Sequence, residues 1–147
     1  MSASVPPQST LRVLLMQRHE LLYERALAAA ELHGYGFVTP ALARLFIQVA
    51  NGPTSVSELA RRLAISRQSL HQTVLAACER GLVELTEDPH NQRVRIVRFT
   101  EAGKRMSQTV LAVDRSLERD LAERIGARNV ERLKEILAMP WSEASPA

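Results

Sequence analysis

Two short stretches of the chain carry the side chains best suited to chemistry, and the first is a polar run, SRQSLHQ, at 66–72. Amide and guanidinium groups form paired hydrogen bonds with base edges, glutamine with adenine and arginine with guanine, and arginine also binds phosphate. Leu70, Val74 and Ala77 recur at helical spacing, so they mark the inward face of a helix whose other face is polar. The residues expected to contact nucleic acid from this helix are Ser66, Arg67, Gln68, Ser69, His71 and Gln72.

These residues are expected to have different roles. Arg67 falls in the first turn of the helix and is expected to fix the register on phosphate, whereas Gln68 or Gln72 is expected to read a base. A plainer interpretation remains open, because any amphipathic surface helix carries polar residues on its outer face.

The second stretch, EDPHNQRVRIVRFTEAG at 87–103, joins a turn-forming start to a strand rich in arginine. It could be an ordinary solvated edge hairpin or a charged finger that touches something acidic. Val97 and Phe99 share one face of the strand, and we expect them to pack on the domain. Arg93 lies nearest the turn and is best placed to enter a minor groove, where narrow A·T tracts concentrate negative potential. We therefore interpret the hairpin as a charged finger.

Arg95 and Arg98 lie farther along the same strand, and two alternatives stay open for them. They could contact phosphate, or they could pair with Glu84 and Glu87 on the neighbouring strand. Both residues are kept as candidate DNA contacts.

Local start and stop signals place these stretches on a small set of elements. Ser55 and Glu58 fit a capping box, in which Ser55 caps the helix and Glu58 returns to the Ser55 amide. Ser66 can cap the next helix, which Gly81 is placed to end. The expected helices are 9–33, 40–49, 57–64, 67–80, 101–125 and 128–139, and the strand-like runs 82–85 and 93–99 are joined by a turn at 86–92.

Two short helices separated by a tight turn and followed by a hairpin describe a winged helix-turn-helix. The expected fold class is mainly α (α+β), with a winged helix-turn-helix lobe and long N- and C-terminal helices that form a dimerisation platform. Residues 1–8 are expected to be a disordered tail and 9–147 a single domain. Within that domain the DNA-binding lobe is expected at about 39–100, and the dimerisation helices at about 9–33 and 101–138.

The outer helices carry apolar stripes that a small lobe alone could not cover. We expect these stripes to pack together across a large hydrophobic interface between two copies of the chain. The residues of the two stripes are Leu11, Leu15 and Leu22, and Met106, Val110, Val113, Leu117 and Leu121.

Composition narrows the function classes. The 147 residues are 46% hydrophobic and 24% charged, as in an ordinary globular protein, and the formal net charge of +3 permits a nucleic-acid partner without requiring one. With Cys78 as the single cysteine an intramolecular disulfide is excluded. No apolar run reaches the length of a membrane span and no signal peptide is recognisable, so the expected location is cytoplasmic, with no membrane partner.

Two stretches, SVSELARRLAISRQSL…ERGLVEL (55–85) and DPHNQRVRIVRFTEAG (88–103), resemble the MarR family of bacterial transcriptional regulators. The wing of that family usually reads Asp-Pro-x-Asp-Arg-Arg, followed by a β-branched strand and Leu-Thr-x-x-Gly. The resemblance implies an obligate homodimer that binds double-stranded DNA at a pseudo-palindromic operator. It also implies a repressor that is released by oxidation or by a small, anionic or phenolic effector bound between lobe and dimer platform.

The chain departs from the family pattern at two places. Asn91-Gln92 stand where the family usually has Asp-Arg, and Gln72 stands where a basic residue is common. These departures leave a second function open, a dimeric winged-helix module that binds protein and has a weakened DNA surface.

Other candidate sites are sparse. His19 and Tyr23, four residues apart on the first helix, could line a ligand crevice with Tyr35 and Arg44, or could be a dimer-interface pair. The histidines are too scattered for a metal site, and Cys78 lacks a second thiol for a redox pair. No nucleophile-and-base set, P-loop or dinucleotide fingerprint is present, so neither a cofactor nor an enzymatic activity is expected.

Overall fold

A computed structural model describes residues 9–141 of the chain, and the predicted tail at 1–8 lies outside these described residues. The structure is mainly helical with a small antiparallel sheet, as the sequence predicted. In chain order the elements are α1 (Leu11–Leu32), α2 (Pro40–Ala50), β1 (Thr54–Ser55), α3 (Val56–Leu63), α4 (Arg67–Glu79), β2 (Val83–Asp88), β3 (Asn91–Phe99), α5 (Glu101–Ile125) and α6 (Ala127–Ala138).

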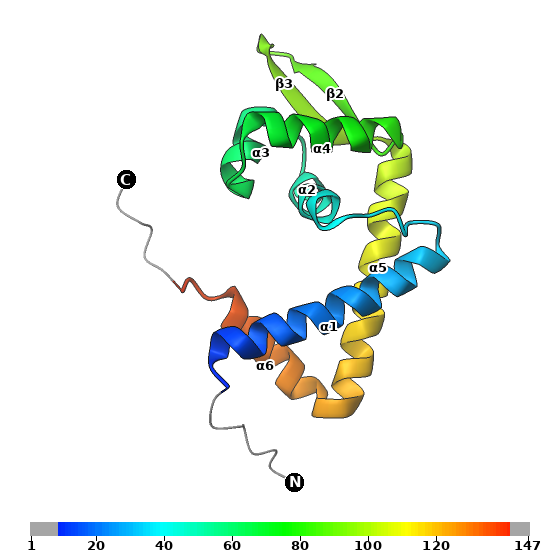
Figure 1. Ribbon diagram of the computed structural model, residues 1–147, viewed down its shortest axis with the longest axis vertical. Coiled ribbons are helices and arrows are strands. Elements are labelled where there is room, and N and C mark those ends of the chain that lie inside the picture. Colours follow the sequence, from blue (N-terminus) through cyan, green and yellow to red (C-terminus); the bar gives the residue numbers. More distant parts are fainter. Residues whose placement is uncertain (1–8, 142–147) are drawn as a thin grey trace.

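The elements form an open, C-shaped molecule (Figure 1). The lobe formed by α2, α3, α4 and the sheet lies at one end, with the β2–β3 hairpin projecting beyond α4. Helix α5 runs from this lobe to the other end, where it packs against α1 and α6. The hairpin and α4 therefore lie at the opposite end of the molecule from α1 and α6.

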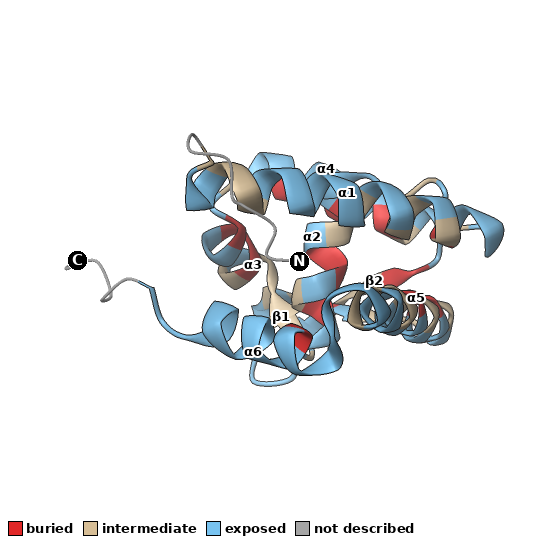
Figure 2. Ribbon diagram, turned by 90° about the horizontal axis from the view of Figure 1, so that it is seen from below, coloured by how far each residue is buried: buried red, intermediate tan, exposed pale blue. Residues whose placement is uncertain are grey.

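The core belongs mainly to the lobe. Figure 2 shows the buried residues gathered where α2, α3 and α4 meet the sheet, whereas α6 is exposed along almost its whole length and buries only Val130. The largest side chains that are fully enclosed are Leu45, Leu59, Leu70, Val74, Val97 and Met106.

Met106 does not belong to the exposed stripe in which it was expected. It is buried in the lobe core, because the first turns of α5 pack directly on the lobe. Gly103 makes this approach possible, since a Cβ built at that position would lie 1.9 Å from the backbone oxygen of Leu82. The backbone amide of Thr100 donates to the same oxygen at 3.1 Å.

The sheet has one strand more than expected, and its hairpin is tighter. The strand order is β1-β3-β2, and β1 pairs Thr54 with Val97 and Ser55 with Ile96. A two-residue strand is too short to show alternation, so no sequence pattern could predict it. The expected turn at 86–92 shrinks to Pro89 and His90, because β2 extends to Asp88 and β3 begins at Asn91.

The capping box at the start of α3 is only half formed. The amide of Glu58 donates to Oγ of Ser55 at 3.2 Å, as expected for the cap. The Glu58 carboxylate does not return to the Ser55 amide, because it binds Arg61 at 2.6 Å and Arg62 at 2.7 Å. Two charge-assisted bonds outweigh one bond to a neutral amide.

Candidate nucleic-acid interface

The start of α4 is shaped by a short turn and a serine cap. Ala64 ends α3 in a left-handed conformation (φ 52°), which turns the chain toward Ser66. The amide of Ser69 donates to Oγ of Ser66 at 3.0 Å, and the two hydroxyl groups are 2.9 Å apart in a second hydrogen bond. Ser66 and Ser69 are thus held by each other at the N-terminus of α4.

Helix α4 has one buried face and one polar face. Leu70, Val74 and Ala77 are fully enclosed, as expected, and they fix the rotation of the helix on the lobe. The predicted contact residues Arg67, Gln68, Ser69, His71 and Gln72 are all exposed.

The long polar side chains on the exposed face of α4 have no partners within the described protein and can bind a ligand. Within residues 9–141, the side chains of Arg67, Gln68 and Gln72 take part in no side-chain hydrogen bond or ion pair. No acidic residue stands in the first turn, so the positive end of the helix dipole is not neutralised there. The surface is polar, positively biased and free to accept hydrogen-bonding groups.

The turn of the wing is stabilised by its own side chains. The Asp88 carboxylate accepts a hydrogen bond from the amide of His90 at 2.7 Å. The Asn91 side-chain oxygen accepts one from the amide of Arg93 at 3.1 Å. Asn91, which departs from the family pattern, thus has a local structural role beside Arg93.

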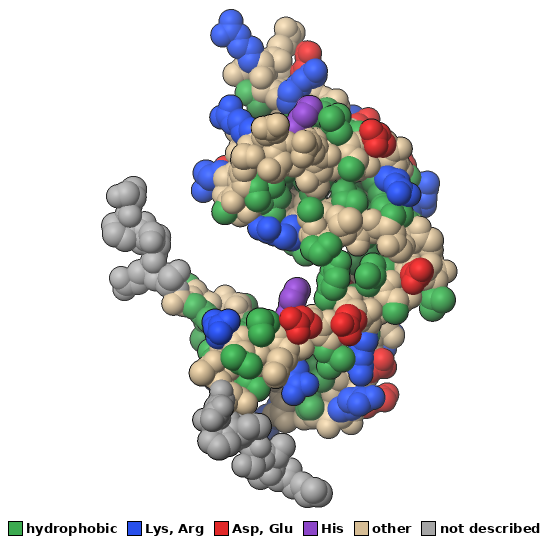
Figure 3. Space-filling view, in the orientation of Figure 1, with side chains coloured by type: hydrophobic (Ala, Val, Ile, Leu, Met, Phe, Trp, Pro, Cys, Tyr) green, Lys and Arg blue, Asp and Glu red, His purple; other side chains and the backbone are tan. Residues whose placement is uncertain are grey.

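The three arginines of the wing differ in their partners. Nε of Arg98 lies 2.7 Å from Oε1 of Glu84, and Nη1 of Arg95 lies 3.8 Å from Oε1 of Glu87. Arg93 is exposed and forms no ion pair with a described residue. The structure thus shows pairing with the glutamates for Arg95 and Arg98, and leaves Arg93 as the free charge near the tip, where basic side chains surround the hairpin in Figure 3.

Arg61 and Arg62, which were not predicted as contacts, add positive charge on α3. Their hydrogen bonds to Glu58, first from Arg61 and then from Arg62, lower the pKa of that carboxyl to about 2. One carboxylate balances two guanidinium groups, so the cluster keeps a net positive charge. The first helix of a helix-turn-helix crosses the nucleic-acid backbone, so a positive charge on this helix lies where it can attract phosphate groups.

Only two of the four residues proposed for a ligand crevice lie together. A cavity of about 440 Å³ between α1, α2 and α5 is lined by His19 and Tyr23, whose rings are stacked with centroids 6.2 Å apart. Arg44 is directed elsewhere, because its Nη2 donates to the backbone oxygen of Leu63 at 2.8 Å. Tyr35 packs edge to face on Phe37 and does not line the cavity.

Asp114 and Glu118 of α5 also line this cavity, and neither was predicted from the sequence. The signal was present, because Asp114 lies four residues after Val110 and three before Leu117, on the apolar stripe itself. Asp114 is solvent-accessible at the edge of the cavity, yet desolvation by its surroundings and, second, the charge of Glu118 raise its pKa.

The lobe that carries this geometry is similar in sequence to known proteins. A sequence description of the MarR family matches residues 38–94, which span α2, α3, α4, β2 and the tip of the wing. Over these residues the chain is similar to the MarR family.

Among its relatives is the HTH-type transcriptional repressor NicR of Pseudomonas putida, which is 28% identical over 101 residues. That match covers 69% of this chain and 61% of NicR, so this chain spans less than two thirds of the length of that relative.

Solved structures of transcriptional regulators share the fold of this chain. The repressor CouR, bound to a 23-mer DNA duplex, superposes with a TM-score of 0.74 at 22% identity over 92% of this chain and 97% of CouR. NadR, in complex with 4-hydroxyphenylacetate, superposes with a TM-score of 0.70 at 20% identity over 92% of this chain and 94% of NadR.

Cys78 lies at the end of α4 and is partly enclosed by the core of the lobe. Desolvation raises the pKa of its thiol, and the charge of Glu84 raises it further. Because the thiolate is the reactive form, this setting disfavours reaction with an oxidant.

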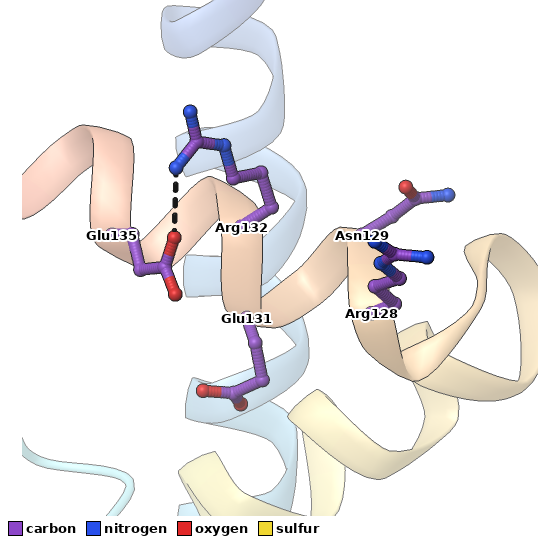
Figure 4. Close-up of a pocket in the computed structure, with 5 residues that line it drawn as sticks. All are labelled: Arg128, Asn129, Glu131, Arg132 and Glu135. Atoms are coloured by element: carbon purple, nitrogen blue, oxygen red, sulfur yellow. Dashed lines mark hydrogen bonds and ion pairs between the residues drawn. The ribbon is translucent and has the colours of Figure 1, made fainter.

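A hollow on α6 is lined by charged and polar side chains, but these side chains do not converge on one point. Figure 4 shows Arg132 and Glu135 satisfying each other, with Nη1 and Oε2 2.9 Å apart, while Glu131 extends to another side of the helix. Arg128 and Asn129 lie nearer the start of α6 and do not point at that pair. The five side chains therefore define no common binding point.

The described residues, 9–141, contain neither a cluster of metal ligands nor a membrane-spanning helix. No group of three or more His, Cys, Asp or Glu side chains in that range is arranged to hold a metal ion. No helix in the described part of the chain has the length and apolar character needed to cross a membrane.

Proposed function

We propose that this chain is a DNA-binding transcriptional regulator, that it acts as a homodimer on a pseudo-palindromic operator as a repressor, and that a small organic effector controls it. The observation that carries this proposal is the arrangement of α4. Its apolar face is locked into the lobe, while Arg67, Gln68, His71 and Gln72 stand free on the outside. A helix of this kind fits the major groove, with its early residues facing the base edges.

The wing supports the same proposal. It projects beside α4 with Arg93 near its tip and without an ion-pair partner in 9–141, in the position from which a charged finger reaches an adjacent groove or phosphate. The match of residues 38–94 to the MarR family, the similarity to the repressor NicR, and a DNA-bound structure with this fold are consistent with it.

The dimer is proposed from the apolar side chains that the outer helices leave uncovered. A single soluble chain rarely exposes so many large apolar groups at one end, so a second copy is the natural cover. Apart from Leu32 at the far end of α1, the exposed large apolar residues on α1 and at the C-terminal end are Leu11, Met16, Leu21, Leu22, Leu133, Ile136, Leu137, Met139 and Trp141.

The effector is proposed from the cavity between α1, α2 and α5. The cavity lies where the lobe meets the outer helices, so a molecule bound there contacts both parts and can bias their relative orientation. NadR, which shares this fold, was solved with 4-hydroxyphenylacetate.

The alternative, a protein-binding winged-helix module, is less well supported. Such a module would present apolar side chains on the outer face of α4. Leu75 is the only large apolar residue of the described α4 that is substantially exposed, at 43%. Its neighbours on that face are polar.

The test is fluorescence polarisation of the full-length protein with labelled duplexes from the DNA upstream of its own gene, at two salt concentrations. We expect saturable binding that is weaker at the higher salt and tighter than binding to a scrambled duplex of equal length. Equal affinity for both duplexes, or no binding at low salt, would contradict the proposal and favour the protein-binding module.

A further inference from the structure

The cavity between α1, α2 and α5 has mostly apolar walls. Its lining includes Leu22, Leu27, Ile47, Leu117 and Leu121, and its volume is about 440 Å³. Figure 3 shows the hollow between the two ends of the molecule, with hydrophobic side chains on its walls and histidine and acidic side chains along its lower rim. A cavity of this size and character suits the ring or hydrocarbon body of a small organic molecule.

The carboxylates that line the cavity carry negative charge. Asp114 and Glu118 line it, and none of the described lining residues is an arginine or a lysine. Arg44 is held outside by its hydrogen bond to the backbone oxygen of Leu63. His19 is the one basic side chain among the described lining residues.

The two carboxylates are not equally compensated. Nζ of Lys134 lies 3.1 Å from Oε2 of Glu118, so Glu118 already has a cationic partner from α6. Asp114 forms no ion pair with any residue of 9–141. Desolvation and, second, the charge of Glu118 raise the pKa of Asp114, so the ionised carboxylate is poorly stabilised by its surroundings.

The Asp114 carboxylate would repel an anionic ligand in the cavity and attract a cationic one. An anion would lose its hydration beside an uncompensated carboxylate and would be repelled by it. A cation would bring the positive charge that Asp114 lacks, and its apolar body would cover the walls. Charge complementarity therefore discriminates between the two classes.

We propose that this cavity selects an amphipathic organic cation, an apolar or aromatic body bearing a protonated amine, with Asp114 as its counter-ion. The inference rests on the proposed effector response and departs from the anionic effector that the family resemblance implied. Glu118 is already paired with Lys134, so it is not the direct partner.

Three small phenols that differ only at the end of a short side chain make suitable probes. Tyramine ends in an ammonium group, tyrosol in a hydroxyl group and 4-hydroxyphenylacetate in a carboxylate. Binding of each to the full-length protein is measured by isothermal titration calorimetry near neutral pH. We expect tyramine to bind about fivefold more tightly than tyrosol, and 4-hydroxyphenylacetate to bind most weakly.

The variant Asp114→Asn tests the counter-ion. It should weaken tyramine about fivefold and leave tyrosol unchanged, so that the preference for the cation disappears. Asp120→Asn is the matched control, because Asp120 is an exposed acid on the same helix that does not line the cavity. The control should keep the preference, and thermal melts of both variants should match the parent.

Three results would overturn the proposal. The first is 4-hydroxyphenylacetate binding as tightly as tyramine, with loss of that binding in His19→Gln, which would assign the cavity to anions. The second is an unchanged tyramine affinity in Asp114→Asn. The third is no saturation by any probe up to about 10 mM, which corresponds to a negligible affinity for a specific site.

DNA binding is measured on the same preparations without any probe. Selective binding of tyramine by a protein that does not bind its upstream DNA would refute the proposed function and leave the cation site standing. Specific DNA binding together with a preference for the carboxylate would refute only the cation site.

Discussion

Arg98 and Glu84 form an ion pair across the hairpin, with Nε and Oε1 2.7 Å apart, whereas Arg93 on the same strand has no such partner among the described residues. The two arginines offer the same charge and differ in availability. Arg98 is held along β3 by its glutamate, so its guanidinium is less free to approach a phosphate than that of Arg93.

This difference predicts unequal effects of two alanine substitutions. Arg93→Ala should weaken DNA binding similarly on related sequences and reduce the slope of log affinity against log salt by about one for each phosphate interaction that it removes. Arg98→Ala should leave the slope nearly unchanged and serves as the matched control. Polarisation titrations at several salt concentrations make the comparison. Equal slopes for the parent and Arg93→Ala would mean that the wing is not a DNA finger.

A second prediction concerns base reading by α4. Gln68 and Gln72 are exposed and unpartnered within the described chain, and a glutamine paired with adenine is worth about 1–3 kcal/mol of discrimination. Gln68→Ala or Gln72→Ala should therefore reduce the penalty of a single mismatch at one position. Arg67→Ala should lower affinity equally on matched and mismatched duplexes, because it removes a phosphate contact.

The three α4 variants are compared on DNA duplexes with inverted half-sites about 10 bp apart, as expected for a two-fold dimer. If neither glutamine substitution alters discrimination at any position, α4 does not read bases through these residues. The protein-binding alternative would then gain support.

A third prediction concerns the dimer. Leu137 lies among the exposed apolar residues of α6, and its replacement by Asp should disrupt an interface built there, because a charge would be buried without a partner. Leu32→Asp is the control, since Leu32 is 87% exposed at the other end of α1. Sedimentation at micromolar concentration should give a dimer for the parent and the control, and a smaller species for Leu137→Asp. A monomeric parent would refute the interface.

A fourth prediction follows from the lowered pKa of Glu58. Its folded-state pKa of about 2 lies below the ordinary value of 4.5, so its ion pairs stabilise the fold above pH 4.5 and this contribution is lost as the pH falls toward 2. Glu58→Gln should therefore be less stable than the parent near neutral pH. The difference should shrink by more than half at about pH 3.

Urea unfolding of the parent and of Glu58→Gln at several pH values measures the difference in their free energies of unfolding. Glu101→Gln is measured in the same way for comparison. Glu101 is paired with Lys104 alone at 2.6 Å, and its pKa is lowered mainly by that hydrogen bond. A difference for Glu58→Gln that stays constant from neutral pH to pH 3 would show that the two arginines do not stabilise the ionised carboxylate.

Much of the lobe could be predicted from the sequence because its signals are local. A cap at Ser66, a stop at Gly81 and the spacing of Leu70, Val74 and Ala77 act within a few residues of the chain. They predict where α4 begins and ends and which side it buries without reference to any distant segment. The family motifs lie in the same region, so the fold class followed from the sequence.

Other features were decided by contacts between segments that are distant along the chain. The apolar stripe of α5 repeats at one helical spacing along its length. Its members nevertheless lie in different places, because Met106 is buried in the lobe core whereas Leu117 and Asp114 line the cavity. The pairing of Arg98 with Glu84 depends on the strand register, and the absence of Arg44 from the cavity depends on the position of α3. Periodicity reports which side chains share a face of a helix. What that face meets depends on how the helices pack in three dimensions, and only the tertiary structure decides that.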